Sequence, residues 1–391
     1  MLASPRGEAL SGARTSSWAG HRPCLVVAGS ARVGNARVTS AQSVAKTRKR
    51  LAEAVNCRPG NVLRFRLVRS RSAEVPDAVV RAALASGNLL RENDRPTATD
   101  SAVTLVRGAD GNNAVLKVAT SQHGIARLRR EGDALDRLQS DGRLGEWRAM
   151  VPVLLGSGNI SGGTYLVTST LPGIDASRAT LDTMRWLTPA VVDAIGPLHL
   201  LDSTEDEVDA VLLDRLVEGP IAELRATVRH TGSVDRLAAG LRAELTGRRV
   251  MLGWTHGDLA LANVMVAGQR VTGIVDWENS RQHDLTVLDL ALWLLIAPGR
   301  GQPREIGARV VSRLRSDQAW LPAESRLLAD RTCGNSISGR ALLLLAWLRH
   351  ITDTLAKSDR YVQSPVWSRR NVMPVLRVID EQDWAAVRDR L

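Results

Sequence analysis

The chain has 391 residues, of which 44% are hydrophobic, so it can form two or three domains and bury a core. Its net charge of +11 suggests a nucleic-acid or membrane partner. However, residues 1–72 hold 12 Arg and 2 Lys against Glu8 and Glu53, a net +12, which leaves 11 − 12 = −1 for residues 73–391. Nucleic acid is therefore not an expected partner of the body of the protein, and only the basic N-terminal segment could bind it.

The cysteines and the apolar runs restrict further the class of protein to which the chain can belong. Cys24, Cys57 and Cys333 are widely spaced and form no CxxC pair, which indicates neither a disulfide framework nor a zinc site. The longest apolar runs, Ala341–Leu348 and Thr286–Pro298, are too short or too polar to span a bilayer. We therefore expect a cytoplasmic protein that does not cross a membrane.

The N-terminal part of the chain carries weak structural signals. Residues 1–50 are rich in Ala, Gly, Ser and Arg, which is typical of a disordered tail. Alternating apolar residues predict a strand at Asn61–Val68, and Pro76–Ala85 reads as a short helix with Pro near its first turn. Residues 51–95 are thus predicted to be an extra layer on a small lobe.

Stronger signals begin after Asp100. Strands are predicted at Ala102–Val106 and Ala114–Ala119, joined by the Asp-Gly turn of Gly108–Asn112. A helix should follow, because apolar residues recur at three to seven residues with charges between them. These apolar positions are Ile125, Leu128, Leu135 and Leu138.

Two further strands, Val151–Leu155 and Thr164–Thr168, lead to a Leu-Pro-Gly connection at 171–173. From Gly173 onward the pattern predicts mostly helix, interrupted only around Thr255–Trp277 by short β-type runs. We therefore expect an α+β protein of two lobes, a nucleotide-binding lobe at 51–172 and a helical lobe at 173–391 that holds the catalytic loop and the substrate site.

The segment Thr255–Glu278 contains three candidate functional residues with oxygen-bearing side chains. Asp258 and Asp276 lie eighteen residues apart, with Asn263 between them, and two apolar runs joined by Ala267–Arg270 predict a hairpin that returns Asp276 beside Asn263. Mg²⁺ prefers carboxylate and carbonyl oxygens completed by phosphate and water. Asn263 and Asp276 supply such ligands, which leaves Asp258 for an attacking hydroxyl.

Upstream, Lys117 sits in the strand AVLKVA and Glu131 in the helix that follows. Phosphoryl transfer requires a metal on the β- and γ-phosphates, a cation on the α- and β-phosphates and a carboxylate that orients the nucleophile. A strand lysine held by a helix glutamate has the geometry that a phosphate-binding lysine needs.

These motifs make the chain resemble the aminoglycoside phosphotransferase and choline kinase family, which has a protein-kinase-like fold with a small antiparallel β lobe and a larger helical lobe. The resemblance runs from about Asp100 to Trp293. Its most specific parts are HGDLALAN at His256–Asn263 and IVDWE at Ile274–Glu278, followed by AVLKVA and by YLVTSTLPG at Tyr165–Gly173. One departure is the nucleotide-covering loop TATDSA, which contains no glycine.

The resemblance implies a role for each matching position. It implies a catalytic base at Asp258, metal ligands at Asn263 and Asp276, and a phosphate ligand at Lys117 with Glu131 as its partner. The backbone of Ser169 and Leu171 would hold adenine, and Thr99 and Ser101 would offer backbone N–H groups to the nucleotide. His256 would support the catalytic loop from within and Asp289 from behind.

The expected activity is ATP- and Mg²⁺-dependent transfer of the γ-phosphate to a hydroxyl of a small molecule. An aminoglycoside or other amino-sugar is one candidate acceptor; choline, homoserine or a sugar intermediate is the alternative. A site for a polycation should be lined by several carboxylates. A second hypothesis is a non-catalytic pseudokinase or adaptor that uses residues 1–72 as an electrostatic handle.

Overall fold

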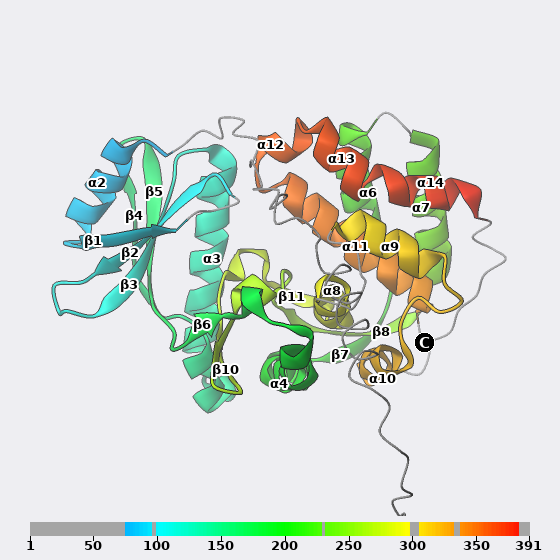
Figure 1. The fold of residues 1–391 in the computed structure, drawn as a ribbon, viewed down its shortest axis with the longest axis horizontal. Coiled ribbons are helices and arrows are strands. Elements are labelled where there is room, and N and C mark those ends of the chain that lie inside the picture. The colour runs from blue at the N-terminus through cyan, green and yellow to red at the C-terminus, as the bar shows by residue number, and fades with distance from the viewer. Residues whose placement is uncertain (1–74, 96–98, 229–230, 298–304, 332–336, 383–391) are drawn as a thin grey trace, which may run out of the picture. The chain divides into compact units, whose positions relative to one another are not determined.

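The computed structural model describes residues 75–95, 99–228, 231–297, 305–331 and 337–382, all within one compact unit, Val68–Leu391. The tail predicted for residues 1–50 and the strand predicted at Asn61–Val68 lie outside the described residues. Figure 1 shows the described elements, with a β-sheet at one end of the unit and most of the helices at the other.

The first part of the unit is an antiparallel five-stranded sheet in the order β1-β2-β3-β5-β4. Residues alternate between its two faces, so Leu116 and Val118 of β3 point to one face and Lys117 to the other. The strands are β1 (Leu90–Arg95), β2 (Ser101–Arg107), β3 (Asn113–Ala119), β4 (Leu154–Ile160) and β5 (Gly163–Ser169).

One helix covers each face of this sheet. Helix α2 (Asp77–Ser86) buries Val80, Ala83 and Leu84 against Leu116 and its neighbours. Helix α3 (Gln122–Ser140), whose first turn is capped by Ser121, packs Leu128 on the opposite face. Because Lys117 points to that second face, it meets the side chains of α3.

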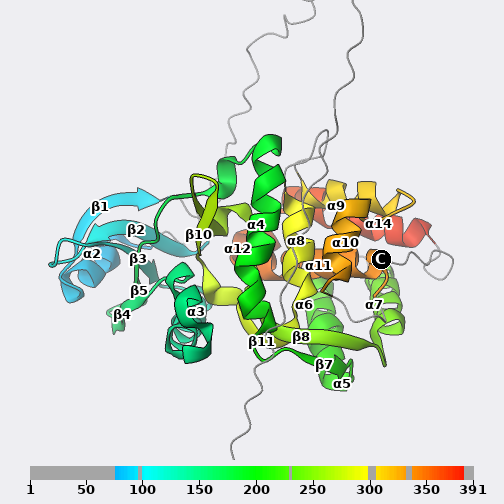
Figure 2. The ribbon, with the colours of Figure 1, turned by 90° about the horizontal axis from the view of Figure 1, so that it is seen from below.

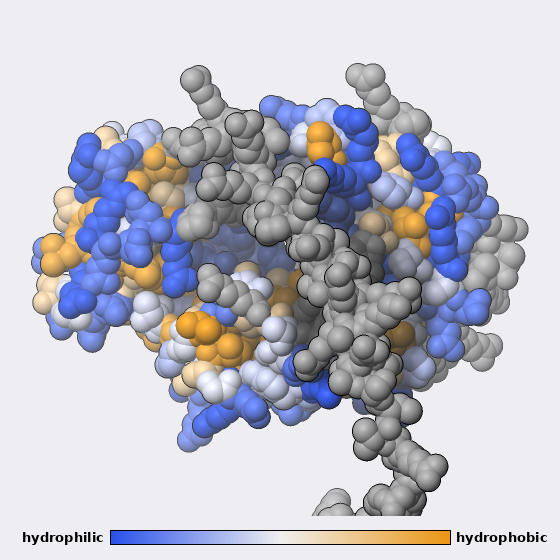
Figure 3. Space-filling view, viewed as in Figure 1, coloured by the Kyte–Doolittle hydropathy of each residue, from blue (hydrophilic) through white to orange (hydrophobic). Residues whose placement is uncertain are grey.

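After β5 the chain passes to a second, three-stranded sheet in the order β10-β9-β6. Its strands are β6 (Ile174–Asp175), β9 (Val264–Ala267) and β10 (Arg270–Ile274). Gly173 permits this passage: its φ is +98°, and a Cβ there would lie 2.3 Å from the carbonyl oxygen of Val266. In Figure 3 a hydrophobic patch lies over the region of β6 and β10, where Ile174 is 70% exposed.

The rest of the unit is mostly helical around one large core. Helix α11 packs against α6, α8 and α9 and is buried along almost its whole length, and Figure 2 shows α4 passing beside α8. A third sheet, in the order β11-β8-β7, consists of β7 (Thr204–Glu207), β8 (Arg249–Thr255) and β11 (Arg281–Leu285). The helices are α4 (Leu181–Leu200), α5 (Ala210–Leu213), α6 (Gly219–Thr227), α7 (Thr231–Leu245), α8 (Val287–Ile296), α9 (Ile306–Leu314), α10 (Pro322–Ala329), α11 (Gly339–Leu355), α12 (Asp359–Val362), α13 (Pro365–Asn371) and α14 (Met373–Glu381).

The structure confirms the predicted helix at Pro76–Ala85, the hairpin of β2 and β3, helix α3 and the hairpin of β9 and β10. The strand predicted at Val151–Leu155 was wrong in its bounds, because residues 142–150 form the 3₁₀ segment η1 and β4 begins only at Leu154. The expectation that β structure after Gly173 is confined to Thr255–Trp277 was also wrong, since β6, β7, β8 and β11 lie mostly or wholly outside that range. None of the described helices is long and apolar enough to cross a bilayer.

Candidate active site

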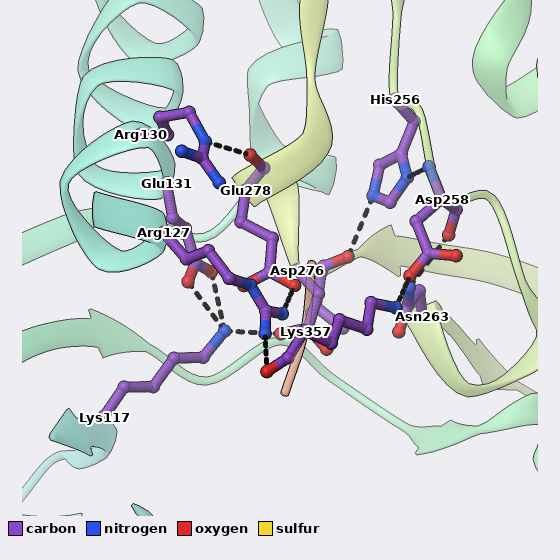
Figure 4. Close-up of polar contacts among 11 residues, drawn as sticks. Lys117, Arg127, Arg130, Glu131, His256, Asp258, Asn263, Asp276, Glu278 and Lys357 are labelled. Carbon is purple, nitrogen blue, oxygen red and sulfur yellow. Dashed lines mark hydrogen bonds and ion pairs between the residues drawn. The ribbon is translucent and has the colours of Figure 1, made fainter. Parts of the chain in front are cut away.

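Lys117 is held between two carboxylates where the five-stranded sheet meets the helical part (Figure 4). Its Nζ donates to Oε1 and Oε2 of Glu131 at 2.7 and 2.8 Å and also to Oδ1 of Asp276. Burial disfavours the charged ammonium, but Asp276 and Glu131 outweigh this effect and raise the pKa of Lys117 above its usual range. Lys117 is therefore a fixed, permanently charged cation whose two partners come from different parts of the unit.

The loop after β8 carries Asp258, and its shape depends on the two residues before it. The backbone N–H of Asp258 donates to Nδ1 of His256 at 3.2 Å, and Nε2 of the same ring lies 2.9 Å from the carbonyl oxygen of Val275. The buried imidazole thus joins the loop to the end of β10. Gly257 has φ +83°, and a Cβ there would lie 2.1 Å from the carbonyl oxygen of Asn279, so only glycine fits.

Asp289, in the first turn of α8, supports this loop from behind. Its Oδ2 accepts the N–H of His256 at 2.7 Å, and its Oδ1 accepts the N–H of Gly257 at 2.8 Å. His199 of α4 lies 3.0 Å from Oδ2. Burial would raise the pKa of Asp289, but the hydrogen bond of His199 and that of the backbone N–H of His256 help to hold it below its ordinary value. The carboxylate is thus ionised and accepts hydrogen bonds from two backbone donors.

Asn263 and Asp276 are brought together by the hairpin of β9 and β10. The carbonyl oxygen of Asn263 accepts the N–H of Val275 at 2.9 Å, directly before Asp276, whose backbone is left-handed with φ 65° and ψ 60°. The amide nitrogen of Asn263 donates to the carbonyl oxygen of Asp258 at 2.8 Å. The oxygen of that amide is therefore the atom able to bind a cation.

The side-chain oxygens of Asn263 and Asp276 suit Mg²⁺, which takes few protein ligands, better than a metal ion that is coordinated by protein side chains alone. Among the described residues no three His, Cys, Asp or Glu side chains gather as a metal site. Asp276 keeps 44% of its side chain exposed, and Asn263 offers one amide oxygen. Two protein oxygens are few for a dedicated cage, but they suit Mg²⁺ that takes its other ligands from phosphate and water.

Three interactions at the site had not been predicted. Nζ of Lys357, which follows α11, lies 2.7 Å from Oδ2 of Asp258. Burial raises the pKa of Asp258, but the ammonium of Lys357 outweighs it and holds the pKa below its ordinary value. The buried Arg127 of α3 binds Glu278 through NH2 and the carbonyl oxygen of Lys357 through NH1 at 3.4 Å. Glu278 belongs to the IVDWE motif, but no feature of the sequence points to Arg127 as its partner or to Lys357 as the partner of Asp258.

The proposed nucleotide contacts lie along the sheet on either side of Lys117. Ser101 opens β2 and pairs with Ala119 of β3, and Thr99 is two residues before it. At the other end, the N–H of Ser169 is already donated to the carbonyl oxygen of Val153 at 2.9 Å. Because this N–H is already used, a backbone contact of Ser169 with adenine would have to be made by its carbonyl oxygen, which could accept a hydrogen bond.

Leu171 follows in the connection between the sheets, where its side chain lies against Gly273 of β10. A hollow of about 450 Å³ borders this connection on the side of η1, between Gln139, Arg148 and Leu171. Ser169 and Leu171 border this hollow, but none of the polar side chains around Lys117 and Asp258 lines it. The hollow therefore borders the connection that would contact adenine and lies apart from the residues that would bind the phosphates.

Comparisons with known proteins bear on the family and the fold of the chain. A model of the phosphotransferase enzyme family matches residues 96–327, and no curated protein matches the chain. The structure of a thermostable mutant of aminoglycoside phosphotransferase APH(4)-Ia, in ternary complex with ADP and hygromycin B, gives a TM-score of 0.52 at 14% identity, over 77% of this chain and 98% of that one. Its apo form gives 0.51 with the same identity and coverage. APH(3'')-Id from Streptomyces rimosus ATCC10970 gives 0.46 at 21% identity, over 73% of this chain and all of that one.

The antiparallel lobe, the helical lobe and the polar cluster between them define a phosphotransferase of the protein-kinase-like α+β fold. The chain belongs to the phosphotransferase enzyme family, whose model covers more than half of it. This confirms the predicted fold class and the predicted class of enzyme.

Proposed function

We propose that this chain transfers the γ-phosphoryl group of MgATP to a hydroxyl of an amino-sugar. The observation that carries the proposal is Lys117, bonded to both Glu131 and Asp276 next to the loop that bears Asp258 and Asn263. Phosphoryl transfer needs a fixed cation, a metal ligand pair and a carboxylate for the nucleophile in one place. Lys117, the pair of Asn263 and Asp276, and Asp258 are our candidates for these three roles.

Lys117 would bind the α- and β-phosphates, with Glu131 holding the ammonium in position. Asn263 and Asp276 would hold Mg²⁺, which neutralises charge on the β- and γ-phosphates when it is bound. The backbone around Ser169 and Leu171 would contact adenine, and that of Thr99 and Ser101 would face the phosphates. The sequence motifs support these assignments, and the contacts of Lys117, Asn263 and Asp276 support those at the phosphates.

Asp258 would orient the acceptor. The acceptor oxygen attacks the γ-phosphorus, the bond between that phosphorus and the β,γ-bridging oxygen breaks, and ADP leaves with the electron pair. The hydroxyl proton passes to the carboxylate of Asp258, which is ionised because its pKa lies below the ordinary value. The carboxylate is therefore in the form that accepts a hydrogen bond from the substrate.

The surroundings of Asp258 support an acceptor with an amino group. His350 and Asp353 of α11 and Lys357 beyond its end are spaced so that they follow one side of the helix. Burial lowers the pKa of His350, and the charges of Asp258 and Asp353 oppose this shift, so both carboxylates lie within reach of this ring. Oδ2 of Asp353 is buried without a hydrogen-bond partner among the described residues, although Oδ1 pairs with Arg281 at 3.2 Å. Burial and the charge of Asp353 together raise the pKa of Glu223. Two neighbouring carboxylates, one with an unused oxygen, would suit an ammonium group of the substrate.

The test is a screen for γ-phosphate transfer against amino-sugars, the same sugars with hydroxyl in place of the amine, choline and homoserine. We expect kcat/KM to be highest for the amino-sugars. In Asp353→Asn this preference should fall about tenfold, since a charged hydrogen bond contributes about 1.5–3 kcal/mol. Asp359→Asn, an exposed neighbour, is the matched control and should keep the preference.

Equal turnover of the amine-free sugars would overturn the acceptor class but leave the kinase activity standing. The adaptor hypothesis makes a different prediction, namely that MgATP does not bind. A ligand at 100 times its Kd adds about 2.7 kcal/mol of stability, which a thermal-shift assay detects easily. An unchanged melting temperature at millimolar MgATP would contradict the proposed function.

A further inference from the structure

We propose that Lys357 is a second phosphate-binding lysine of this active site, whose ammonium leaves Asp258 for the oxygens of the transferred phosphoryl group when MgATP and acceptor bind. This inference rests on the proposed phosphotransfer function. It adds a catalytic residue from the far end of the chain, beyond the stretch 96–327 that the family model matches.

Lys357 lies where such a residue would have to be. Its Nζ is 2.7 Å from Oδ2 of Asp258, and the two side chains are only 17% and 13% exposed. In Figure 4 the lysine side chain extends toward Asp258, and Asn263 is bonded to the backbone of the same aspartate. Its ammonium therefore lies at the carboxylate that would receive the acceptor, close to one of the two candidate metal ligands.

The backbone at Lys357 is fixed from two directions. Its N–H donates to the carbonyl oxygen of Thr354 at 3.1 Å, as the chain leaves α11, and its carbonyl oxygen accepts from Arg127. Arg127 is itself held by Glu278. Arg127 and Glu131 are four residues apart on α3 and so lie on one face of that helix. The same helix thus holds Lys117 through Glu131 and the main chain of Lys357 through Arg127.

The amino-acid composition of the chain also supports a functional role for Lys357. Its 52 Lys and Arg residues include only four lysines, Lys46, Lys49, Lys117 and Lys357. Almost every cation of the body is thus an arginine, and the two lysines between residues 73 and 391 both lie in this cluster. A purely structural ion pair could use arginine, as Arg349 does with Asp284 at 2.6 Å. Lysine differs in being a compact charge on a flexible stem, with three donors that can change partner without a planar fork to reorient.

Electrostatics also favours the movement of the Lys357 ammonium from Asp258 to the γ-phosphoryl group. An acceptor hydroxyl must reach the carboxylate of Asp258 and so competes with Lys357 for its oxygens. A buried ammonium deprived of its partner is strongly destabilised. The γ-phosphoryl group brings three oxygens whose charge is shared in the transition state, and a cation aimed at them contributes to the rate. A lysine displaced by the acceptor therefore finds a new anionic partner in the reacting group.

The experiment measures binding of MgADP and of Mg-AMP-PNP, which differ in the γ-phosphoryl group, by calorimetry, each with the best acceptor of the transfer screen present at saturating concentration. The variants are Lys357→Met, which removes the charge, Lys357→Arg, which keeps it, and Arg369→Met, an exposed matched control on α13. We expect K357M to bind MgADP like the parent and to weaken Mg-AMP-PNP about tenfold or more. Its kcat should fall about 10²- to 10³-fold. K357R should keep the parent's MgADP affinity and lose about tenfold or more in kcat, and R369M should match the parent.

Each other outcome decides against the proposal. If K357M weakens both nucleotides equally, or neither, Lys357 does not contact the γ-phosphoryl group, although the kinase function stands. If K357M does not fold, a K357R variant with the parent's kcat would still overturn the proposal. If the parent itself binds neither nucleotide, the proposed function fails together with the role of Lys357.

Discussion

Replacement of Asp289 by Asn should destabilise the protein and misplace Asp258 without touching substrate. The carboxylate is 1% exposed and accepts N–H groups from His256 at 2.7 Å and from Gly257 at 2.8 Å. An amide of the same shape has one oxygen, so one of these two backbone donors must face an NH₂ group. The substitution therefore removes one charge-assisted bond and weakens the other.

The size of the effect follows from those two bonds. An unsatisfied buried donor costs about 1–3 kcal/mol, and exchange of a charged for a neutral acceptor costs about 1 kcal/mol more. The expected loss in the free energy of unfolding is therefore about 2–4 kcal/mol. At about 2–4 °C per kcal/mol for a large domain, the melting temperature should fall by roughly 4–16 °C.

The assay is thermal unfolding followed by steady-state kinetics below the lower melting temperature. We expect kcat to drop for Asp289→Asn while the KM for MgATP changes little, because Lys117 and Asp276 are not bonded to Asp289. Asp136→Asn, on the exposed side of α3, is the control and should change neither quantity. A variant of Asp289 with the parent's stability would refute the idea that this carboxylate holds the loop.

Three further predictions concern other parts of the site. Glu131→Gln removes an anionic partner of Lys117 and should weaken MgATP binding about tenfold in calorimetry; unchanged affinity would mean that the pair is not needed to position the lysine. Asp284 has a pKa held below its ordinary value of 3.8, because the charge of a neighbouring arginine outweighs burial. It therefore contributes stability above about pH 4 that is lost as the pH falls through its lowered pKa, and Asp284→Asn should unfold at lower denaturant concentration at pH 7 and respond less to acid than the parent. An equal acid response in both proteins would contradict this. Gly257→Ala places a Cβ 2.1 Å from the carbonyl oxygen of Asn279 at φ +83°, so it should cost roughly 2–4 kcal/mol in denaturant unfolding, and a cost below 1 kcal/mol would show that the loop is not rigid.

The parts of the site that could be predicted from the sequence are those encoded over short distances. Asp258 and Asn263 share one loop, and the hairpin that returns Asp276 has clear apolar strands and a short turn. Lys117 and Glu131 are fourteen residues apart on a strand and the helix after it. In such cases local geometry determines which side chains meet.

The contacts that were missed join distant segments. Lys357 and Asp258 are 99 residues apart, and Arg127 and Glu278 are 151 apart. Lys357 lies in a short polar stretch without periodicity, so no pattern indicates which side of the site it reaches. These contacts depend on how α11 and α3 pack, which is a tertiary property.

Two of the strands that were missed, β7 and β11, are short and polar. β7 has the sequence TEDE and β11 has RQHDL, so neither shows the apolar alternation by which strands are recognised. Both lie at the edges of a three-stranded sheet around β8, where one side of the strand faces no partner strand. Charged residues are common at such edges because they discourage pairing with other chains.

The central claim is that Asn263 and Asp276 hold a divalent cation together with the phosphates of the nucleotide. The most direct test is binding of Mn²⁺, a spectroscopic substitute for Mg²⁺, measured by electron paramagnetic resonance with and without AMP-PNP. We predict tight Mn²⁺ binding only when AMP-PNP is present, a loss of about tenfold or more in Asp276→Asn, and little change in Asp258→Asn. Tight binding of Mn²⁺ without nucleotide, or unchanged binding in Asp276→Asn, would contradict the claim.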